Sequence, residues 1–137
     1  MSATPYYIGA LIIGAAVWAY WTAIQPRPFE PERQHGRIAY VIDGDTLKIE
    51  GVKPRIRLFG VDAPEKGERG AQEATDALKR YAPKGRAVSF VQMDTDRHGR
   101  IVARVYAGSN EINAQMIQSG AASEFCRYSK GLYGNCG

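Results

Sequence analysis

The sequence predicts an α+β fold, a five-stranded, partly open β-barrel of the OB type with two to three helices, preceded by a single N-terminal transmembrane helix. Three observations lead to this prediction. Five segments alternate apolar and polar residues like half-buried strands, two repeat apolar residues at helical spacing, and one apolar run precedes every charged residue. Many activities use such a barrel, so function must be argued from individual residues.

The segment before the first charged residue predicts a membrane helix. No Asp, Glu, Lys or Arg lies between Met1 and Gln25, and the apolar run Tyr6–Ile24 has the ~20 residues that a spanning helix needs. Aromatic residues stand at both ends of this run, as they do at membrane interfaces. We therefore predict an anchor in residues 1–25, with a cleaved signal peptide or a buried helix as the alternatives.

A linker and a basic domain follow this segment. Residues 26–34 contain three prolines, which predicts a short, stiff linker. The folded domain is then expected in residues 35–137. The formal net charge of +4 favours a polyanionic partner, either nucleic acid or an anionic membrane surface.

The first half of the domain is expected to hold three strands and a helix. A tight turn at Gly44 joins the first two strands, and apolar residues alternate with arginines in the third. The helix repeats apolar residues three and four positions apart and is ended by Pro83 and Gly85. These elements are expected at Gly36–Asp43, Thr46–Glu50, Pro54–Val61 and Gly67–Tyr81.

The second half is expected to hold two strands and a helix. The sequence D-T-D-R-H-G separates the strands, and Gly120 ends the helix. An aromatic- and glycine-rich loop follows Ala121. These elements are expected at Arg86–Met93, Arg100–Ala107 and Asn110–Ser119.

Two observations conflict about the side of the membrane on which the domain lies. Cys126 and Cys136 are the only cysteines, and an even pair in a short chain predicts a disulfide outside the cytosol, although two free thiols are the alternative. Arg27, Arg33 and Arg37 follow the apolar run and favour a cytoplasmic domain. We give the cysteines more weight and predict a periplasmic or extracellular domain, with secretion after signal cleavage as the alternative.

Four carboxylates fall where strands end. Asp43 and Asp45 lie in V-I-D-G-D-T-L-K-I-E, and Asp62 and Glu65 lie in I-R-L-F-G-V-D-A-P-E. Each of them taken alone is more typical of an exposed turn. Together they would repel one another, so a hard cation is the natural occupant, and oxygen ligands indicate Ca²⁺ or Mg²⁺. The two histidines lack the spacing of a zinc hydrolase.

Two arginines are candidates for phosphate binding. Arg57 alternates with apolar residues in the third expected strand, and Arg100 opens a later strand in D-R-H-G-R-I-V-A-R-V-Y. The planar guanidinium matches phosphate oxygens, and two such groups can clamp one phosphodiester. The alternative for each is an exposed surface arginine.

Three of these blocks resemble the staphylococcal nuclease (thermonuclease) family in its order and spacing: V-I-D-G-D-T-L-K-I, I-R-L-F-G-V-D-A-P-E and D-R-H-G-R-I-V-A-R-V-Y. They are followed by N-x-x-M-I-Q-S-G-A-A, which resembles the family's next helix and turn. The resemblance covers residues 36–124. It implies an OB-type barrel and Ca²⁺-dependent hydrolysis of phosphodiester bonds in DNA and RNA.

The resemblance also implies roles for individual residues. The Ca²⁺ ligands would be oxygen atoms of Asp45, Asp62 and the Ala63 carbonyl, with Asp43 close by. The catalytic set would be Arg57, Glu65 and Arg100. Two positions depart from the family pattern: Ala63 replaces the Thr of the best-known member, and His98 replaces a Tyr.

Two other classes of function remain open. One is a catalytically inactive OB-type module that binds nucleic acid, and the other is a membrane-tethered interaction domain of an envelope or polysaccharide pathway. The presence of Arg57, Glu65 and Arg100 together favours a nuclease with low sequence specificity over both. We expect the protein to act as a monomer.

Overall fold

The computed structural model describes residues 6–25 and 31–137. The chain divides into two units, residues 1–31 and 32–137, and each is described by itself. Most of the predicted linker, residues 26–30, lies outside the described residues, as do residues 1–5 of the predicted anchor.

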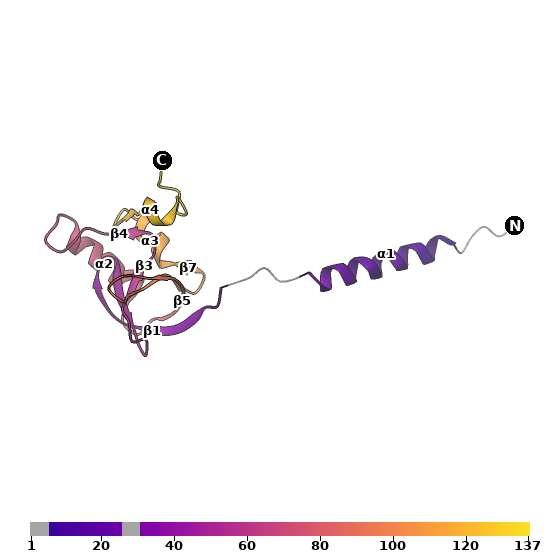
Figure 1. The fold of residues 1–137 in the computed structure, drawn as a ribbon, viewed down its shortest axis with the longest axis horizontal. Helices are drawn as coiled ribbons and strands as arrows, with labels where there is room; N and C mark the ends of the chain where they lie inside the picture. The colour runs from indigo at the N-terminus through magenta and orange to yellow at the C-terminus, as the bar shows by residue number, and fades with distance from the viewer. Residues whose placement is uncertain (1–5, 26–30) are drawn as a thin grey trace. The chain divides into compact units, whose positions relative to one another are not determined.

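The first unit contains one helix, α1 (Tyr6–Ala23) (Figure 1). The helix expected in this segment is therefore present. Within the part of the chain that the structure describes, no helix is both long and apolar enough to cross a membrane. The predicted transmembrane anchor is therefore not supported.

The second unit combines a sheet with short helices, which confirms the α+β prediction. Its helices are α2 (Ala71–Tyr81), α3 (Ile112–Gln118) and α4 (Cys126–Ser129). Its strands are β1 (Gln34–Asp43), β2 (Thr46–Ile49), β3 (Ile56–Leu58), β4 (Val61–Asp62), β5 (Ala87–Thr95), β6 (Ile101–Ala107), β7 (Asn110–Glu111) and β8 (Ser123–Glu124).

Five strands of this unit pair in a closed ring. β1 pairs antiparallel with β2 and β5, β2 pairs with β3, and β5 pairs with β6. β3 then pairs in parallel with β6, which places Arg57 opposite Val102 and completes the ring. β7 extends the sheet beyond β6, and β4 and β8 form a separate pair. The ring therefore joins the two segments that carry the candidate arginines.

An apolar core lies beneath these strands, and α3 contributes one buried polar residue to it. The Asn113 side chain is fully buried. Its Nδ2 donates to the Phe59 and Ala103 carbonyls at 2.9 and 3.1 Å, and its Oδ1 accepts from the Val105 backbone N–H at 2.9 Å. Because these hydrogen bonds satisfy the polar groups of a fully buried side chain, Asn113 fixes α3 against β6 and the chain after β3.

Several elements differ from those expected: β7 and β8 are additional short strands, and β7 takes the first two residues of the second expected helix. The third expected strand is divided into β3 and β4, because Gly60 takes a left-handed φ of +69° between them. A Cβ there would lie 2.9 Å from Cε2 of Tyr133, so glycine also lets the C-terminal tail approach. The first expected helix begins at Ala71, after Gly70 takes a φ of +88°. The short helix α4 was not expected at all.

The turn at Gly44, between Asp43 and Asp45, packs directly against α2. A Cβ on Gly44 would lie 2.7 Å from the Ala74 Cβ and 2.8 Å from the Ala63 Cβ. Both alanines are buried, and Ala74 faces the core from α2. The absence of a side chain at Gly44 therefore lets α2 and the chain after β4 pack directly on the turn between Asp43 and Asp45.

This packing predicts the effect of a single methyl group. We expect Gly44→Ala to lower the free energy of unfolding by about 1–3 kcal/mol, because the new Cβ overlaps two packed side chains. Chemical denaturation measures the loss. Adding Ala74→Gly should recover part of it, so that the double variant is more stable than the sum of the single effects. Strict additivity would contradict the proposed contact.

Candidate functional site

The acidic turn is held by hydrogen bonds that involve both of its carboxylates. Asp43 Oδ1 accepts from the backbone N–H of Asp45 at 3.2 Å, and the Thr46 hydroxyl donates to Asp45 Oδ1 at 2.9 Å. The Asp45 carbonyl accepts from the backbone N–H of Leu58 on β3 at 2.8 Å. These contacts hold the Asp45 side chain at the end of β2 in a half-buried position.

Arg57 lies beside this turn because β2 and β3 pair. Its Nη2 lies 3.4 Å from Asp45 Oδ2, and the two side chains are only 18% and 16% exposed. Its Nη1 donates to the Leu58 and Val61 carbonyls at 3.1 and 2.9 Å. The guanidinium therefore joins the acidic turn to the connection between β3 and β4.

The environment of Asp45 raises the pKa of its carboxyl group. Burial is the largest cause; Arg57 and the Thr46 hydroxyl oppose it, and the neighbouring Asp43 adds to the increase. A negative charge at this position is therefore incompletely compensated by the protein itself. A cation bound to the turn would remove that cost, and the carboxylate oxygens offered here are those that Ca²⁺ prefers. The turn thus offers oxygen ligands of the kind that the predicted metal takes.

The other predicted metal ligands lie on the segment that follows. Asp62 is exposed at the end of β4, opposite Ser123 of β8. Ala63 is buried against the Gly44 turn, which brings its backbone close to the acidic residues. Asp45, Asp62 and the Ala63 carbonyl remain the predicted ligands, and Asp43 remains their predicted neighbour.

Arg100 is held by a different carboxylate, Asp96, in the loop between β5 and β6. Asp96 Oδ2 accepts from Arg100 Nε at 2.6 Å, and Asp96 Oδ1 accepts from the backbone N–H groups of His98 and Arg100 at 2.9 and 3.0 Å. Gly99, with a φ of +75°, closes the turn. One carboxylate therefore shapes the loop and fixes the guanidinium through Nε, which leaves the two Nη groups for other partners.

These hydrogen bonds determine the charge of Asp96. Desolvation is the largest single influence and acts to raise the pKa, but the hydrogen bonds from Arg100 and His98 together outweigh it and lower the pKa of Asp96. The carboxylate therefore stays ionised at neutral pH and keeps its charged hydrogen bond with Arg100.

Both arginines line one cavity of about 580 Å³. Apolar and aromatic side chains form part of its wall, and the β5–β6 loop forms another part. The remaining lining residues are Phe59, Gly60, Asp94, Thr95, Asp96, Arg97, His98, Val102, Phe125 and Tyr128. The structure thus brings Arg57 and Arg100 together, whereas none of the predicted carboxylates is among the residues that line this cavity. Glu65 is exposed in the loop between β4 and α2.

Three residues of this cavity were missed by the sequence analysis. Asp96 could have been found from D-R-H-G-R, since an Asp before a glycine turn commonly accepts backbone hydrogen bonds. Phe125 and Tyr128 lie in the aromatic tail, and their rings meet edge to face with centroids 4.8 Å apart. Nothing in their spacing indicated that the tail returns to β3 and β6.

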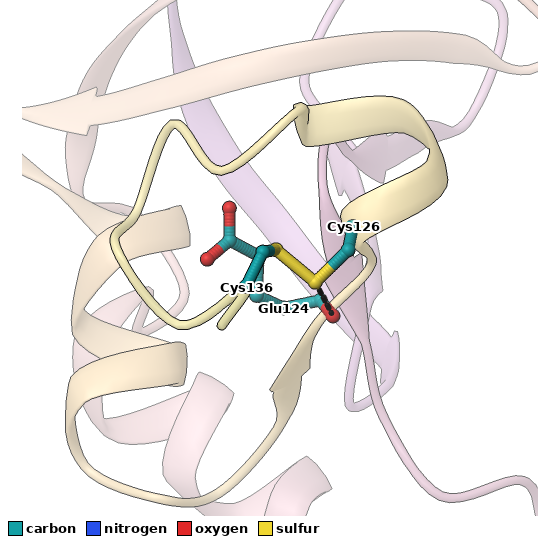
Figure 2. A group of neighbouring side chains, drawn as sticks. All are labelled: Glu124, Cys126 and Cys136. Carbon is teal, nitrogen blue, oxygen red and sulfur yellow. Dashed lines mark hydrogen bonds between the residues drawn. A yellow bond between two sulfur atoms is a disulfide. The ribbon is translucent and has the colours of Figure 1, made fainter.

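The tail is attached to the cavity by its backbone and by a disulfide. The Phe125 N–H donates to the Gly60 carbonyl at 2.8 Å. Cys126 and Cys136 form a disulfide, which confirms that prediction (Figure 2). The disulfide closes a loop around α4, and a cross-link of this kind restricts the unfolded chain.

A buried carboxylate occupies the centre of the closed loop. Glu124 is only 9% exposed. Its Oε1 accepts from the Ser129 hydroxyl at 2.5 Å and from the Tyr133 N–H at 3.0 Å, and its Oε2 accepts from the Asn135 N–H at 2.8 Å. Desolvation acts most strongly and would raise its pKa, but these three hydrogen bonds together lower the pKa of Glu124.

The side chains of Glu124, Cys126 and Cys136 lie close enough to suggest a metal site, and within the described ranges they are the one such group of three. The two sulfur atoms are bonded to each other (Figure 2). Both carboxylate oxygens of Glu124 already accept hydrogen bonds from other residues of the tail. These contacts explain the cluster as a structural anchor of the tail.

The fold and the site define a small α+β domain in which a carboxylate turn lies beside Arg57, and Arg57 and Arg100 line one cavity. A family model described as "Staphylococcal nuclease homologue" matches residues 55–134. This chain therefore belongs to the staphylococcal nuclease family.

Three proteins to which this chain is similar have different names. An "Uncharacterized endonuclease" of Escherichia coli is 39% identical over 98 residues, which cover 69% of this chain and 63% of the relative. The "Succinoglycan biosynthesis protein ExoI" of Rhizobium meliloti (strain 1021) is 37% identical over 106 residues, 69% of this chain and 54% of the relative. The "Thermonuclease" of Staphylococcus hyicus is 30% identical over 95 residues, 63% and 56%. The chain thus spans less than two thirds of each relative's length.

The hydrogen bonds of Glu124 predict a pH dependence of stability. Because its pKa is lowered by folding, the stability that it contributes is present above its ordinary pKa of 4.5 and is lost as the pH falls below that value. We expect the melting temperature of the wild-type protein to fall more between about pH 6 and about pH 3 than that of Glu124→Gln. Exposed Glu73→Gln on α2 is the matched control and should follow the wild type. Identical profiles for wild type and Glu124→Gln would contradict this role.

Proposed function

We propose that this protein is a Ca²⁺-dependent nuclease that hydrolyses phosphodiester bonds in DNA and RNA. The observation that carries the proposal is the position of Arg57 and Arg100 in one cavity, with Arg57 paired to the carboxylate of Asp45. Membership of the staphylococcal nuclease family supports the same activity. The closed ring of strand pairings supports a barrel of the OB type.

The metal would be held by Asp45, Asp62 and the Ala63 carbonyl, with Asp43 supporting the turn. When bound, Ca²⁺ supplies Lewis-acid stabilisation of the negative charge on a phosphate oxygen. The raised pKa of Asp45 supports this assignment, because the carboxylate gains most from a neighbouring cation where the protein leaves its charge partly uncompensated.

The two arginines would stabilise the charge that grows on the phosphate. Arg57 is positioned by its contacts with Asp45 and with the Leu58 and Val61 carbonyls, and its Nε–H stays available for the substrate. Arg100 is positioned through Nε by Asp96, so its Nη groups can donate to the substrate. Donors fixed before the substrate arrives need no reorganisation during the reaction, which is the main source of their effect.

Glu65 would orient or deprotonate the attacking water. It lies on the loop that leaves β4 directly after Asp62 and Ala63, and its exposed side chain is accessible to solvent and substrate. The backbone of this loop is fixed by two contacts with Glu68: the Glu65 N–H donates to its Oε2 at 3.1 Å, and the Glu65 carbonyl accepts from its N–H at 2.9 Å. A carboxylate is a suitable base for this step.

The chemistry of the cavity favours low sequence specificity. Its charged groups are suited to phosphate oxygens, which are the same in every nucleotide, so binding should depend strongly on salt and little on sequence. Both DNA and RNA present this group. The disulfide supports a location in an oxidising compartment, periplasmic or extracellular.

The relative named for succinoglycan biosynthesis favours a second candidate, a role in a polysaccharide pathway. In that case the domain would act as an interaction module or on another substrate. A phosphodiesterase assay separates the two candidates, because only the nuclease requires Arg57 and Arg100 to act on a phosphodiester.

The first test is a plasmid-nicking assay. We expect the purified protein to nick supercoiled DNA and to degrade RNA in the presence of Ca²⁺, and to lose both activities when EDTA removes the metal. Asp45→Ala should abolish Ca²⁺ binding by calorimetry while the protein stays folded. Absence of cleavage in Ca²⁺ by a folded wild-type protein would refute the nuclease assignment.

The second test concerns the catalytic set. Glu65→Gln and Arg100→Ala should each reduce kcat by at least ~10²-fold, in line with the loss of one transition-state contact. Arg80→Gln, an exposed residue on α2 outside the cavity, is the control and should retain the wild-type rate. Near-normal rates in the first two variants, with circular dichroism unchanged, would contradict their roles.

A further inference from the structure

A second cavity adjoins the first. It has a volume of about 510 Å³ and is lined by Pro54, Arg55, His98, Gly99 and Arg100. His98 and Arg100 also line the first cavity. We call this second space the Arg55 cavity. The two cavities therefore lie side by side around His98 and Arg100.

The backbone places Arg55 beside the β5–β6 loop. Its carbonyl accepts from the backbone N–H of Ile101 at 2.9 Å, immediately before Ile56 and Ile101 pair in the parallel strands. Ile56 is fully buried, so the residues on either side of it, Arg55 and Arg57, are directed away from the core. Residues two positions apart along a strand are separated by roughly 6.6 Å, so the two guanidinium groups can contact different anionic groups of one ligand.

The Arg55 cavity is cationic. Its lining contains two arginines and a histidine but no carboxylate. Among the residues that the structure describes, no carboxylate oxygen lies within 4.0 Å of the Arg55 guanidinium. Arg100 contacts Asp96 through Nε, so its Nη groups are free to serve either cavity. A second anionic group would therefore find uncompensated positive charge next to the first.

From this arrangement we infer that the Arg55 cavity binds a second phosphate of a single-stranded polynucleotide, adjacent to the phosphate held by Arg57 and Arg100. The inference rests on the proposed nuclease function, and it adds the preferred substrate: a strand with at least two phosphates. Arg55 then acts on substrate binding. Its effect appears in KM for oligonucleotides and is missing for substrates with a single phosphate.

Two substrates separate this role from a general effect. The first is the 4-nitrophenyl ester of thymidine 5′-phosphate, which has one phosphate, and the second is single-stranded hexathymidylate. We expect Arg55→Gln to lower the preference for hexathymidylate, the ratio of the two kcat/KM values, by about tenfold, which corresponds to the loss of one phosphate contact. The matched control Arg80→Gln removes the same charge from α2 and should keep the wild-type ratio.

A binding measurement provides a readout that does not require cleavage. Fluorescence anisotropy of labelled hexathymidylate in EDTA should show weaker binding to Arg55→Gln, with a plot of log K against log salt less steep by about 0.7, the value for one contact to a single strand. Arg80→Gln should keep the wild-type slope. A wild-type protein that does not bind hexathymidylate would overturn the second phosphate site.

The possible failures can be told apart. If the wild-type protein binds hexathymidylate in an Arg55-dependent manner but cleaves no substrate, the nuclease proposal is wrong and the second phosphate site stands. If the wild-type protein cleaves both substrates and Arg55→Gln matches Arg80→Gln, the nuclease stands and the second site is wrong. Equal losses on both substrates would show that Arg55 affects the whole site, which also overturns the inference.

Discussion

The contacts of the Arg57 guanidinium connect the parts of the candidate site. This side chain is paired with Asp45 at the end of β2 and donates to the carbonyl of Val61, one residue before Asp62. The same strand, β3, pairs in parallel with β6, which begins directly after Arg100. A change in the position of Arg57 would therefore disturb the acidic turn, the predicted metal segment and the cavity that both arginines line. Its half-buried position strengthens these charge contacts relative to those at an open surface.

Arg104 of β6 and Arg100 of the preceding loop differ in how many contacts their guanidinium groups make. Arg104 makes a two-pronged contact with Glu111, at 3.0 and 2.7 Å, and Glu111 also accepts from the Tyr133 hydroxyl. That network occupies one edge of the Arg104 guanidinium and ties the tail to β6 and β7. Among the described residues, the Arg100 guanidinium contacts only Asp96, through Nε. One arginine is thus committed to structure, while the other keeps donors for a ligand.

The C-terminal tail completes the cavity although it lies far along the chain from the arginines. The disulfide and the three hydrogen bonds of Glu124 hold the loop in which Tyr128 lies, and Gly60 gives the loop room to approach β3. Phe125 and Tyr128 thereby line the same space as Arg57 and Arg100. An aromatic wall beside a cationic group suits a ligand with both a flat base and a phosphate.

The sequence by itself determined the regular elements and the candidate residues, because apolar periodicity and turn residues are local properties that burial enforces. The Gly44 turn, the strands around it and α2 were predictable in this way. The cysteine pair was predicted from the number of cysteines, and Arg57 and Arg100 from guanidinium chemistry and the family resemblance. Only the tertiary structure decided which charges meet. Contacts within the folded chain position Arg100 beside Asp96 and place it between two cavities. Contacts between distant segments also bring Phe125 and Tyr128 back to the chain after β3, near Gly60. Such contacts leave no periodic signal, since each one requires the surrounding strands to be paired before the two residues are close.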